Sequence, residues 1–387
     1  MWVAAVTAMA GCGGDGKSAN DLSVVDLAVG DDLSPAPDLS VAADLSVVSQ
    51  DMAPPCTILD GGSAAELRCT GLYDDWASRH VDPANLPFKP AFEFWADGAQ
   101  KSRWIYLPAG QKIDVSNMNE WTFPVGTKIW KEFRLDIGGS VKKVETRILQ
   151  KLAAGSWDMQ TYVWSPDQST ATLQTTPILP FPGTTSYEVP VGKCGACHNH
   201  RADKVLGFEA VLLAAPEATG LTWSQLQATS KLTSSNGNET IAASALHLLD
   251  GAKRAIERNA VGYLHVNCGI MCHKPGGGVP FAMRLTIDNT TKKTPDDVTT
   301  TDVYLGAVNQ LSGFTPPASS GTYYRLRPTD DTRSTIYYRT GQRDQLQGGS
   351  DQMPPFGTHS VDTVGRQTLD DWIHYMTTAN GYPAPSP

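Results

Sequence analysis

Two short cysteine and histidine motifs carry the most specific chemistry in this sequence. The first reads Cys194-Gly195-Ala196-Cys197-His198 and fits the pattern Cys-x-x-Cys-His. In that order, two thiols can add to the vinyl groups of a porphyrin while the adjoining imidazole binds the iron. The second reads Cys268-Gly269-Ile270-Met271-Cys272-His273, with one extra residue between the thiols. The sequence therefore predicts two covalently attached haems c, with His198 and His273 as iron ligands.

The same four cysteines have two other possible uses. Cys194, Cys197, Cys268 and Cys272 could bind zinc, which also prefers two close pairs of thiolates. Structural zinc pairs usually lie closer together in a sequence, and zinc does not require a histidine after each pair. In an exported protein, each pair could also form a disulfide. The repeated terminal histidine favours haem over both alternatives.

The residues around the second motif predict a further ligand. Met353 is followed by Pro354 and Pro355, and this loop comes well after the attachment motif. Proline fixes φ and removes a hydrogen-bond donor, so such a loop can hold a thioether sulfur rigidly. We expect His273 and Met353 to be the two axial ligands of the second haem. A half-buried loop methionine without a ligand role is the alternative.

The sixth ligand of the first haem is harder to identify. No methionine lies between Cys197 and the second motif. His247, in an Ala- and Leu-rich stretch, and His265, three residues before Cys268, are the candidates. For either of them taken singly, an ordinary satisfied or surface histidine is the preferred interpretation. If neither binds, the iron is five-coordinate and can take an exogenous ligand.

Two helices are expected to position the second motif. Before it, apolar residues at helical spacing predict a helix that leads directly into Cys268. After it, a second apolar stripe predicts a helix that begins at Asp362 or Thr363. The stripes consist of Ile256, Ala260, Tyr263 and Leu264, and of Leu369, Trp372, Ile373 and Met376.

Residues 56–190 have the sequence pattern of a β-rich domain. Aromatic and β-branched runs alternate with Gly and Pro turns, which predicts a β-sandwich or a barrel-like domain. The expected strands are Phe92–Trp95, Arg103–Leu107, Lys128–Leu135, Lys143–Leu149 and Thr161–Trp164. Their aromatic residues are expected to form a core rather than a ligand cleft. Cys56 and Cys69 lie at the start of this domain and are expected to form a disulfide if the protein is exported.

The N-terminus predicts export and a lipid anchor. Residues 1–12 are apolar and end in Met9-Ala10-Gly11-Cys12, which resembles a bacterial lipoprotein cleavage box, although no basic residue precedes it. Lipidated Cys12 would hold the chain at a membrane, and Gly13 after it resembles an outer-membrane address. Residues 13–55 repeat an Asp-Leu-Ser theme without aromatic residues. We expect a disordered acidic spacer there, with a partner-binding repeat as the alternative.

The distribution of charge argues against a nucleic-acid partner. The chain of 387 residues has a net charge of -9, from 31 basic and 40 acidic residues. Eight Asp and one Lys in residues 13–55 account for -7, which leaves about -2 for the rest. A chain without a basic excess has little attraction for a phosphate backbone. No run of eighteen apolar residues is present, so no spanning helix is expected.

Taken together, these segments resemble a family of exported bacterial dihaem c-type cytochromes with a class I cytochrome c domain at the C-terminus. The resemblance lies in Phe94–Ala99, Lys101, Arg103–Ile105, Trp121–Thr127, Glu145–Arg147, Cys194–His198, Tyr263–Cys268 and Met353–Pro355. It implies an α+β multidomain fold, with the β-rich domain followed by an all-α cytochrome c-type region. The expected parts are a signal remnant (1–12), the linker (13–55), the β-rich domain (56–190), a first haem-binding segment (191–253) and a cytochrome c-like domain (254–380).

The resemblance and the motifs together predict single-electron transfer by a protein anchored at the outer membrane, facing the periplasm or the cell surface. Its redox partner would be another protein, which the sequence does not identify. The alternative is a haem-dependent oxidoreductase of the peroxidase type, with an open coordination site at the first haem. A third class is an exported binding protein without haem.

Overall fold

The computed structural model describes residues 55–59, 62–249, 254–274, 279, 281–343 and 351–385. These residues belong to one compact unit, Pro54–Pro387, and the other unit, Met1–Ala53, lies outside them. The predicted signal remnant, Cys12 and nearly all of the acidic spacer therefore fall outside the described residues. Within the described part, no helix is long and apolar enough to cross a membrane.

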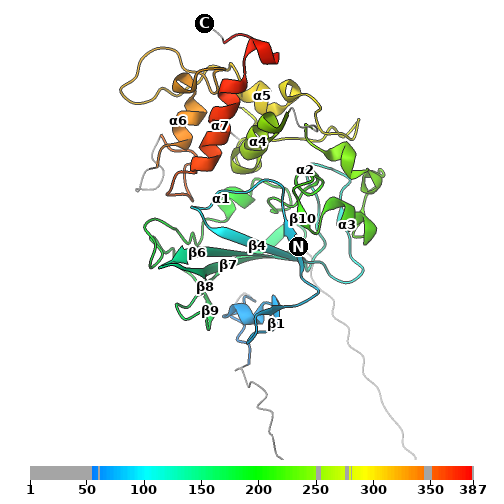
Figure 1. Ribbon diagram of the computed structural model, residues 1–387. Helices are drawn as coiled ribbons and strands as arrows, with labels where there is room; N and C mark the ends of the chain where they lie inside the picture. Colours follow the sequence, from blue (N-terminus) through cyan, green and yellow to red (C-terminus); the bar gives the residue numbers. More distant parts are fainter. Residues whose placement is uncertain are drawn as a thin grey trace, which may run out of the picture. The chain divides into compact units, whose positions relative to one another are not determined.

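The centre of the compact unit is a seven-stranded antiparallel sheet with the strand order β10-β3-β4-β6-β7-β8-β9 (Figure 1). Its longest strands, β6, β7 and β8, are consecutive in the chain and pair as a meander. The strands are β3 (Leu86–Lys89), β4 (Gln100–Tyr106), β6 (Lys128–Ile137), β7 (Ser140–Ala153), β8 (Ser156–Trp164), β9 (Ala171–Leu173) and β10 (Thr219–Gly220). Two small sheets pair β1 (Tyr73–Asp75) with β2 (His80–Val81), and β5 (Ile113–Asp114) with β11 (Leu232–Thr233).

A two-residue turn joins the longest pair of strands. Gly138 and Gly139 have φ values of 64° and 80°, which side chains other than glycine rarely adopt. Two consecutive residues with positive φ match the twist of antiparallel strands, so this turn closes the β6–β7 hairpin tightly. The Asp136 carboxylate accepts a hydrogen bond from the Gly139 amide at 2.8 Å and fixes the turn.

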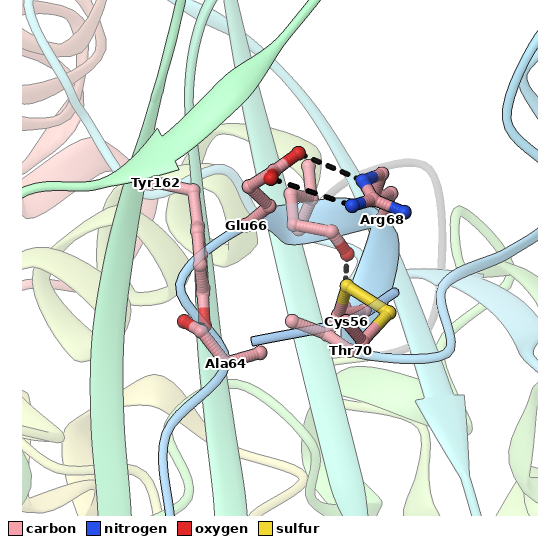
Figure 2. Close-up of a disulfide and its surroundings, with 8 residues drawn as sticks. Cys56, Ala64, Glu66, Arg68, Thr70 and Tyr162 are labelled. Carbon is pink, nitrogen blue, oxygen red and sulfur yellow. Dashed lines mark hydrogen bonds and ion pairs between the residues drawn. A yellow bond between two sulfur atoms is a disulfide. The ribbon is translucent and has the colours of Figure 1, made fainter. Parts of the chain in front are cut away.

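One face of the sheet packs against the segment that contains Cys56 and Cys69. Large side chains on this face, among them Trp130, Tyr162 and Trp164, form a core with Leu67 and Leu72. The predicted disulfide is confirmed, with the two Cα atoms 5.6 Å apart. Figure 2 shows the disulfide near the Glu66–Arg68 ion pair, with Tyr162 reaching from β8 to the Ala64 carbonyl at 2.8 Å.

The other face of the sheet lies toward the helices of the C-terminal part, with α1 between them and the strands (Figure 1). The largest apolar core joins residues of this face to helices that precede the second motif and to helices that follow it. The helices are α1 (Gly195–His198), α2 (Ala210–Leu213), α3 (Trp223–Ala228), α4 (Ala255–Leu264), α5 (Asp302–Ala307), α6 (Thr335–Thr340) and α7 (Thr363–Tyr375). A π-helical turn, η5 (His265–Gly269), continues α4, and short 3-10 turns are η1 (Leu67–Cys69), η2 (Asn238–Thr240), η3 (Ala243–Leu246), η6 (Val298–Thr300), η7 (Asp331–Arg333) and η8 (Thr378–Asn380).

The two helices predicted around the second motif are present as α4 and α7, and they pack against each other. Asp362 caps α7 by accepting a hydrogen bond from the Gly365 amide at 2.8 Å. Gly365 is required there, because a Cβ atom would collide with the Tyr263 ring of α4. The four apolar residues predicted on α7 are fully buried, whereas Ile256 of α4 is 38% exposed.

The mixed α and β composition agrees with the predicted fold class, but the arrangement is different. Seven of the described strands form one open sheet with β10 and β9 at its edges, and two small two-stranded sheets lie apart from it, rather than a sandwich or a barrel. The C-terminal part is not all-α, because its helices are short and isolated bridges such as Val308–Leu326 join the loops between them. The segment 191–253 also contributes β10 to the sheet, so it folds together with the β-rich part.

The strand predicted over Phe92–Trp95 does not form. This segment is an extended strap that packs on the residues preceding Cys268. Phe94 lies in a small core with Val266 and Ile270, and the Trp95 amide donates to the Asn267 side chain at 2.8 Å. Phe94 is therefore buried by contact with residues of the second motif and of the segment before it, and not by pairing in the sheet.

Candidate haem site

A single cavity of about 650 Å³ lies between the sheet and the C-terminal part. Both motifs line it through Cys194, Cys197, His198, Cys268, Cys272 and His273, and Met353 lines it as well. The volume lies within the range of roughly 300–1,000 Å³ that is typical of ligand and cofactor sites. The structure thus brings together seven predicted site residues that are spread over 160 positions of the chain.

The backbone turns of the two motifs are equivalent despite their different lengths. In the first motif, the His198 amide donates to the Cys194 carbonyl at 3.0 Å. In the second, the His273 amide donates to the Cys268 carbonyl at 2.9 Å, although one more residue lies between them. The wider turn of the second motif begins inside the π-helical turn η5, which includes Cys268 and Gly269, and wider turns of this kind accommodate single extra residues. The longer motif therefore keeps the link between its first cysteine and its histidine.

The ring of His198 is held as an iron ligand would need to be. Its Nδ1 lies 2.5 Å from the Lys204 carbonyl, which can only accept, so Nδ1 carries the proton. The other ring nitrogen, Nε2, then presents a lone pair. Burial lowers the pKa of His198 to about 4, so the imidazole is neutral at pH 7. Histidine ligands of metals are commonly oriented by such a hydrogen bond to a backbone carbonyl.

The ring of His273 has a different environment. Among the described residues its Nδ1 has no hydrogen-bond partner, although the atom is buried. The Phe281 ring lies 4.6 Å from the imidazole ring, between centroids. Burial lowers the pKa of His273. The nearby Phe281 backbone acts in the opposite direction, although the two groups are not placed to form a hydrogen bond. This histidine is also neutral at pH 7, but its orientation depends on packing.

The four thiols are free in this structure and are not arranged as a zinc site. No disulfide joins Cys194, Cys197, Cys268 and Cys272. Within the described residues, only Asp331, Asp370 and His374 bring three possible ligand atoms within 4.8 Å of one another, and they do not line the cavity. Burial raises the pKa of Cys197 to about 11, and the nearby Cys272 thiol adds to that shift. The two motifs therefore lie close enough to interact electrostatically.

The loop that carries Met353 is attached to several parts of the cavity wall. Its Met353 amide donates to the Arg339 carbonyl of α6 at 3.0 Å, and the Gln352 side chain donates to the Thr358 carbonyl at 2.9 Å. Just beyond the loop, His359 Nε2 lies 2.8 Å from Glu188, which also accepts from Lys193 at 3.1 Å. Burial alone would raise the pKa of Glu188, but its hydrogen bonds with His359 and Lys193 lower it. Through Glu188, the methionine loop is linked to Lys193, the residue just before the first motif.

The two histidines proposed for the sixth position of the first haem do not line this cavity. His265 is fully buried, and both ring nitrogens are occupied. Its Nε2 lies 2.8 Å from Glu209, and its Nδ1 accepts from the Leu285 amide at 3.0 Å. In this structure His265 therefore connects the segment 191–253, through Glu209, to the segment that carries the second motif. His247 lies on the chain after η3 and is likewise absent from the cavity wall.

Sequence reasoning missed other side chains that line the cavity. Besides Met353, three thioethers do so, from Met159 of β8, Met271 and Met283. Lys131 of β6 also faces it. Met159 precedes both motifs in the chain, outside the stretch between them that holds His247 and His265. The alternation of side chains along β8 can be read from the sequence, but the strand pairing that turns this face of the sheet toward the motifs cannot.

Comparisons of the chain with protein-family models, with curated proteins and with solved structures find no match.

Proposed function

We propose that this chain is an exported dihaem c-type cytochrome that transfers single electrons. The observation that carries the proposal is the one cavity lined by the cysteines and histidines of both motifs. A site for one haem would need one motif, and two unrelated sites would need two cavities. Two haems in a common cavity would be close enough to exchange electrons directly.

Each part of the chain has a defined role in this proposal. Haem, when bound, supplies the one-electron change at iron. The cysteine pairs would hold the two haems covalently, and His198 and His273 would each bind an iron through a ring nitrogen. Met353 would bind the second iron through its thioether sulfur. Apolar side chains such as Phe133, Leu206 and Phe281 keep water away from the cavity.

The second motif and its helices support the expected likeness to a class I cytochrome c domain. Helix α4 leads through η5 into Cys268, and α7 packs against α4 after the methionine loop. The loops between these helices are longer and contain more bridges than an all-α domain would have. We therefore limit the proposed likeness to this helix pair, the motif and Met353.

A peroxidase-like oxidoreductase is the second candidate, and one observation favours it. Among the described cavity residues, His198 and His273 are the only histidines. No further histidine is therefore placed to fill the sixth coordination position of the first iron. Three cavity thioethers could do so instead. Carbon monoxide separates the two functions, because it should bind rapidly to reduced protein only if one iron is five-coordinate.

The proposed location is the periplasm or the cell surface, with Cys12 lipidated at the outer membrane. The Cys56–Cys69 disulfide supports an oxidising compartment. There the chain would exchange electrons with a redox partner protein. A binding protein without haem is the remaining class, and it predicts no Soret absorption.

The test is the reduced pyridine haemochrome spectrum, together with the intact mass, of the full chain expressed with a cytochrome c maturation system. The proposal predicts two covalent haems per chain. One haem would show that the longer motif is not used and would reject the dihaem assignment. A chain with none would reject electron transfer altogether.

A further inference from the structure

The wall of the cavity has an excess of positive charge. Seven Lys and Arg side chains line it in the described part, against two carboxylates, Asp97 and Glu188. Both carboxylates have other partners, because Asp97 accepts from the His359 and Ser360 amides and Glu188 is bonded to His359 and Lys193. Buried charges are costly unless they are paired, so a cavity of this composition favours an anionic occupant.

Three of these cations lie side by side on the sheet. Arg103 of β4 pairs with Lys131 of β6, and Lys131 pairs with Arg147 of β7. Like charges directly opposite each other destabilise a sheet unless something compensates them. Arg147 is compensated, because its guanidinium donates twice to Glu145, at 2.8 and 2.6 Å. The other two are not compensated to the same degree.

Arg103 and Lys131 both have unused hydrogen-bonding capacity at the cavity. The Arg103 side chain is only 6% exposed, and its Nη1 is buried without a hydrogen-bond partner. Its Nη2 reaches Glu93 only at 3.5 Å. Lys131 has no hydrogen bond or ion pair among the described residues. Its ammonium group lies over the Phe94 and Phe133 rings, 5.5 and 4.8 Å from their centroids.

This pair of cations lines the cavity that the two motifs share. The Lys131 ammonium group lies over the Phe94 ring, and Phe94 belongs to the same small core as Ile270 of the second motif. A ligand bound by the pair would therefore occupy the same cavity as both attachment sites.

We propose that Arg103 and Lys131 together bind a carboxylate of the cofactor, a haem propionate, on the sheet face of the cavity. This inference rests on the proposed function. Haem brings propionates into any site that it occupies, and the cavity has no other unpaired anion among its described residues to meet these donors. A charge-assisted contact of this kind is stronger than a neutral hydrogen bond.

The assignment has a consequence for electron transfer. A positive charge near haem iron favours the reduced state, which carries one positive charge less than the oxidised state. Burial lowers the pKa of Lys131, and a propionate beside it would keep its ammonium group protonated. Protonated Lys131 should therefore raise the reduction potential of the haem that it contacts, in addition to holding its propionate.

The experiment compares Lys131→Met and Lys131→Arg with wild type in a spectroelectrochemical titration. Lys128→Met is the matched control, because Lys128 lies on the same strand but donates to the Thr70 carbonyl at 2.8 Å, outside the cavity. In Lys131→Met, one of the two midpoints should fall by about 59 mV, the equivalent of a tenfold change for a one-electron couple. Lys131→Arg should restore most of the shift, and Lys128→Met should leave both midpoints in place.

Three results would overturn the inference. If Lys131→Met has the midpoints of Lys128→Met, Lys131 does not contact a propionate. If its spectrum instead becomes high-spin, Lys131 is an iron ligand. If inorganic phosphate shifts the wild-type midpoints but not those of Lys131→Met, the pair binds a free oxyanion.

Haem content and thermal unfolding, measured on the same samples, separate these results from misfolding. Wild-type protein without haem would reject the proposed function, and this inference with it. Wild type with two haems and an unchanged Lys131→Met midpoint would reject this inference alone. A poorly folded Lys131→Met variant leaves Lys131→Arg to decide, because the inference predicts that only a positive charge at this position preserves the midpoint.

Discussion

The two motifs of the cavity share a backbone turn but differ in what holds their histidines. His198 is fixed by a hydrogen bond from Nδ1 to the Lys204 carbonyl, and strands of the sheet lie around it. His273 has no such bond among the described residues and packs beside Phe281. The methionine loop follows the second motif in the chain, and Met353 lines the cavity together with both motifs.

This difference suggests a division of roles. In the proposed dihaem protein, the first site would orient His198 through its hydrogen bond and leave the sixth position to cavity thioethers or an added ligand. The second site would orient His273 by packing and take Met353 as its sixth ligand. We expect the second iron to be six-coordinate and to serve electron transfer. We expect the first iron to be the more accessible of the two to added ligands.

The largest expected effect comes from removing one pair of cysteines. Cys194→Ser with Cys197→Ser should abolish one covalent haem, and Cys268→Ser with Cys272→Ser should abolish the other. Intact mass measures both losses. Cys56→Ser with Cys69→Ser is the control and should keep two haems. A chain that retains two haems after loss of Cys268 and Cys272 would contradict the role given to the longer motif.

Replacing Met353 should remove a ligand without removing a haem. Met353→Leu keeps the volume but lacks the sulfur, so the second iron should become accessible to carbon monoxide and its reduction potential should fall. Carbon monoxide binding and redox titration measure this. Met159→Leu is the companion variant, and it should affect the first haem or neither. Equal effects of the two variants on one haem would remove the distinction between the sites.

The connection between the two sites should be important for stability. Glu209, which is 4% exposed, holds His265 at 2.8 Å and Arg201 at 2.7 Å. Breaking a buried ion pair from one side costs about 3–5 kcal/mol, so Glu209→Gln should lower the free energy of unfolding by that amount. Glu217→Gln, at a more exposed pair with Arg258, should cost less than about 1 kcal/mol. The haem spectrum should stay unchanged in Glu209→Gln, since both ring nitrogens of His265 have partners outside the cavity.

The smallest expected effect comes from the glycine that follows the first cysteine of each motif. A Cβ atom on Gly269 would collide with the Met283 carbonyl, a backbone group that cannot easily move. At Gly195 the nearest atom belongs to the flexible Asn199 side chain. Gly269→Ala should therefore destabilise the protein by about 1–3 kcal/mol, and Gly195→Ala by roughly 0.5 kcal/mol or less. Thermal unfolding of the two variants compares them directly, and equal losses would contradict the tighter packing of the second motif.

The sequence predicted those features that depend on local patterns. The Cys56–Cys69 disulfide, the capped helix α7 and strands β4, β6, β7 and β8 all follow from spacing, alternation and turn residues. The motifs and Met353 were also identified in this way, and the structure places them on one cavity wall.

The features that depend on long-range contacts were not predicted. The Phe92–Trp95 segment alternates like a strand, but its burial comes from residues near 266. His265 resembles a ligand by its position, but Glu209, which occupies it, lies 56 residues away in the chain. Lys131 faces the cavity because of strand pairing, and no local pattern shows which face of a strand will meet a distant motif.

The central claim is that two haems share one cavity, and the electron paramagnetic resonance spectrum of the oxidised protein tests it most directly. The two single-haem variants described above provide the reference spectra. If the haems share the cavity, the wild-type spectrum should show magnetic interaction between the irons and should differ from the sum of the two references. A wild-type spectrum equal to that sum would contradict the shared cavity.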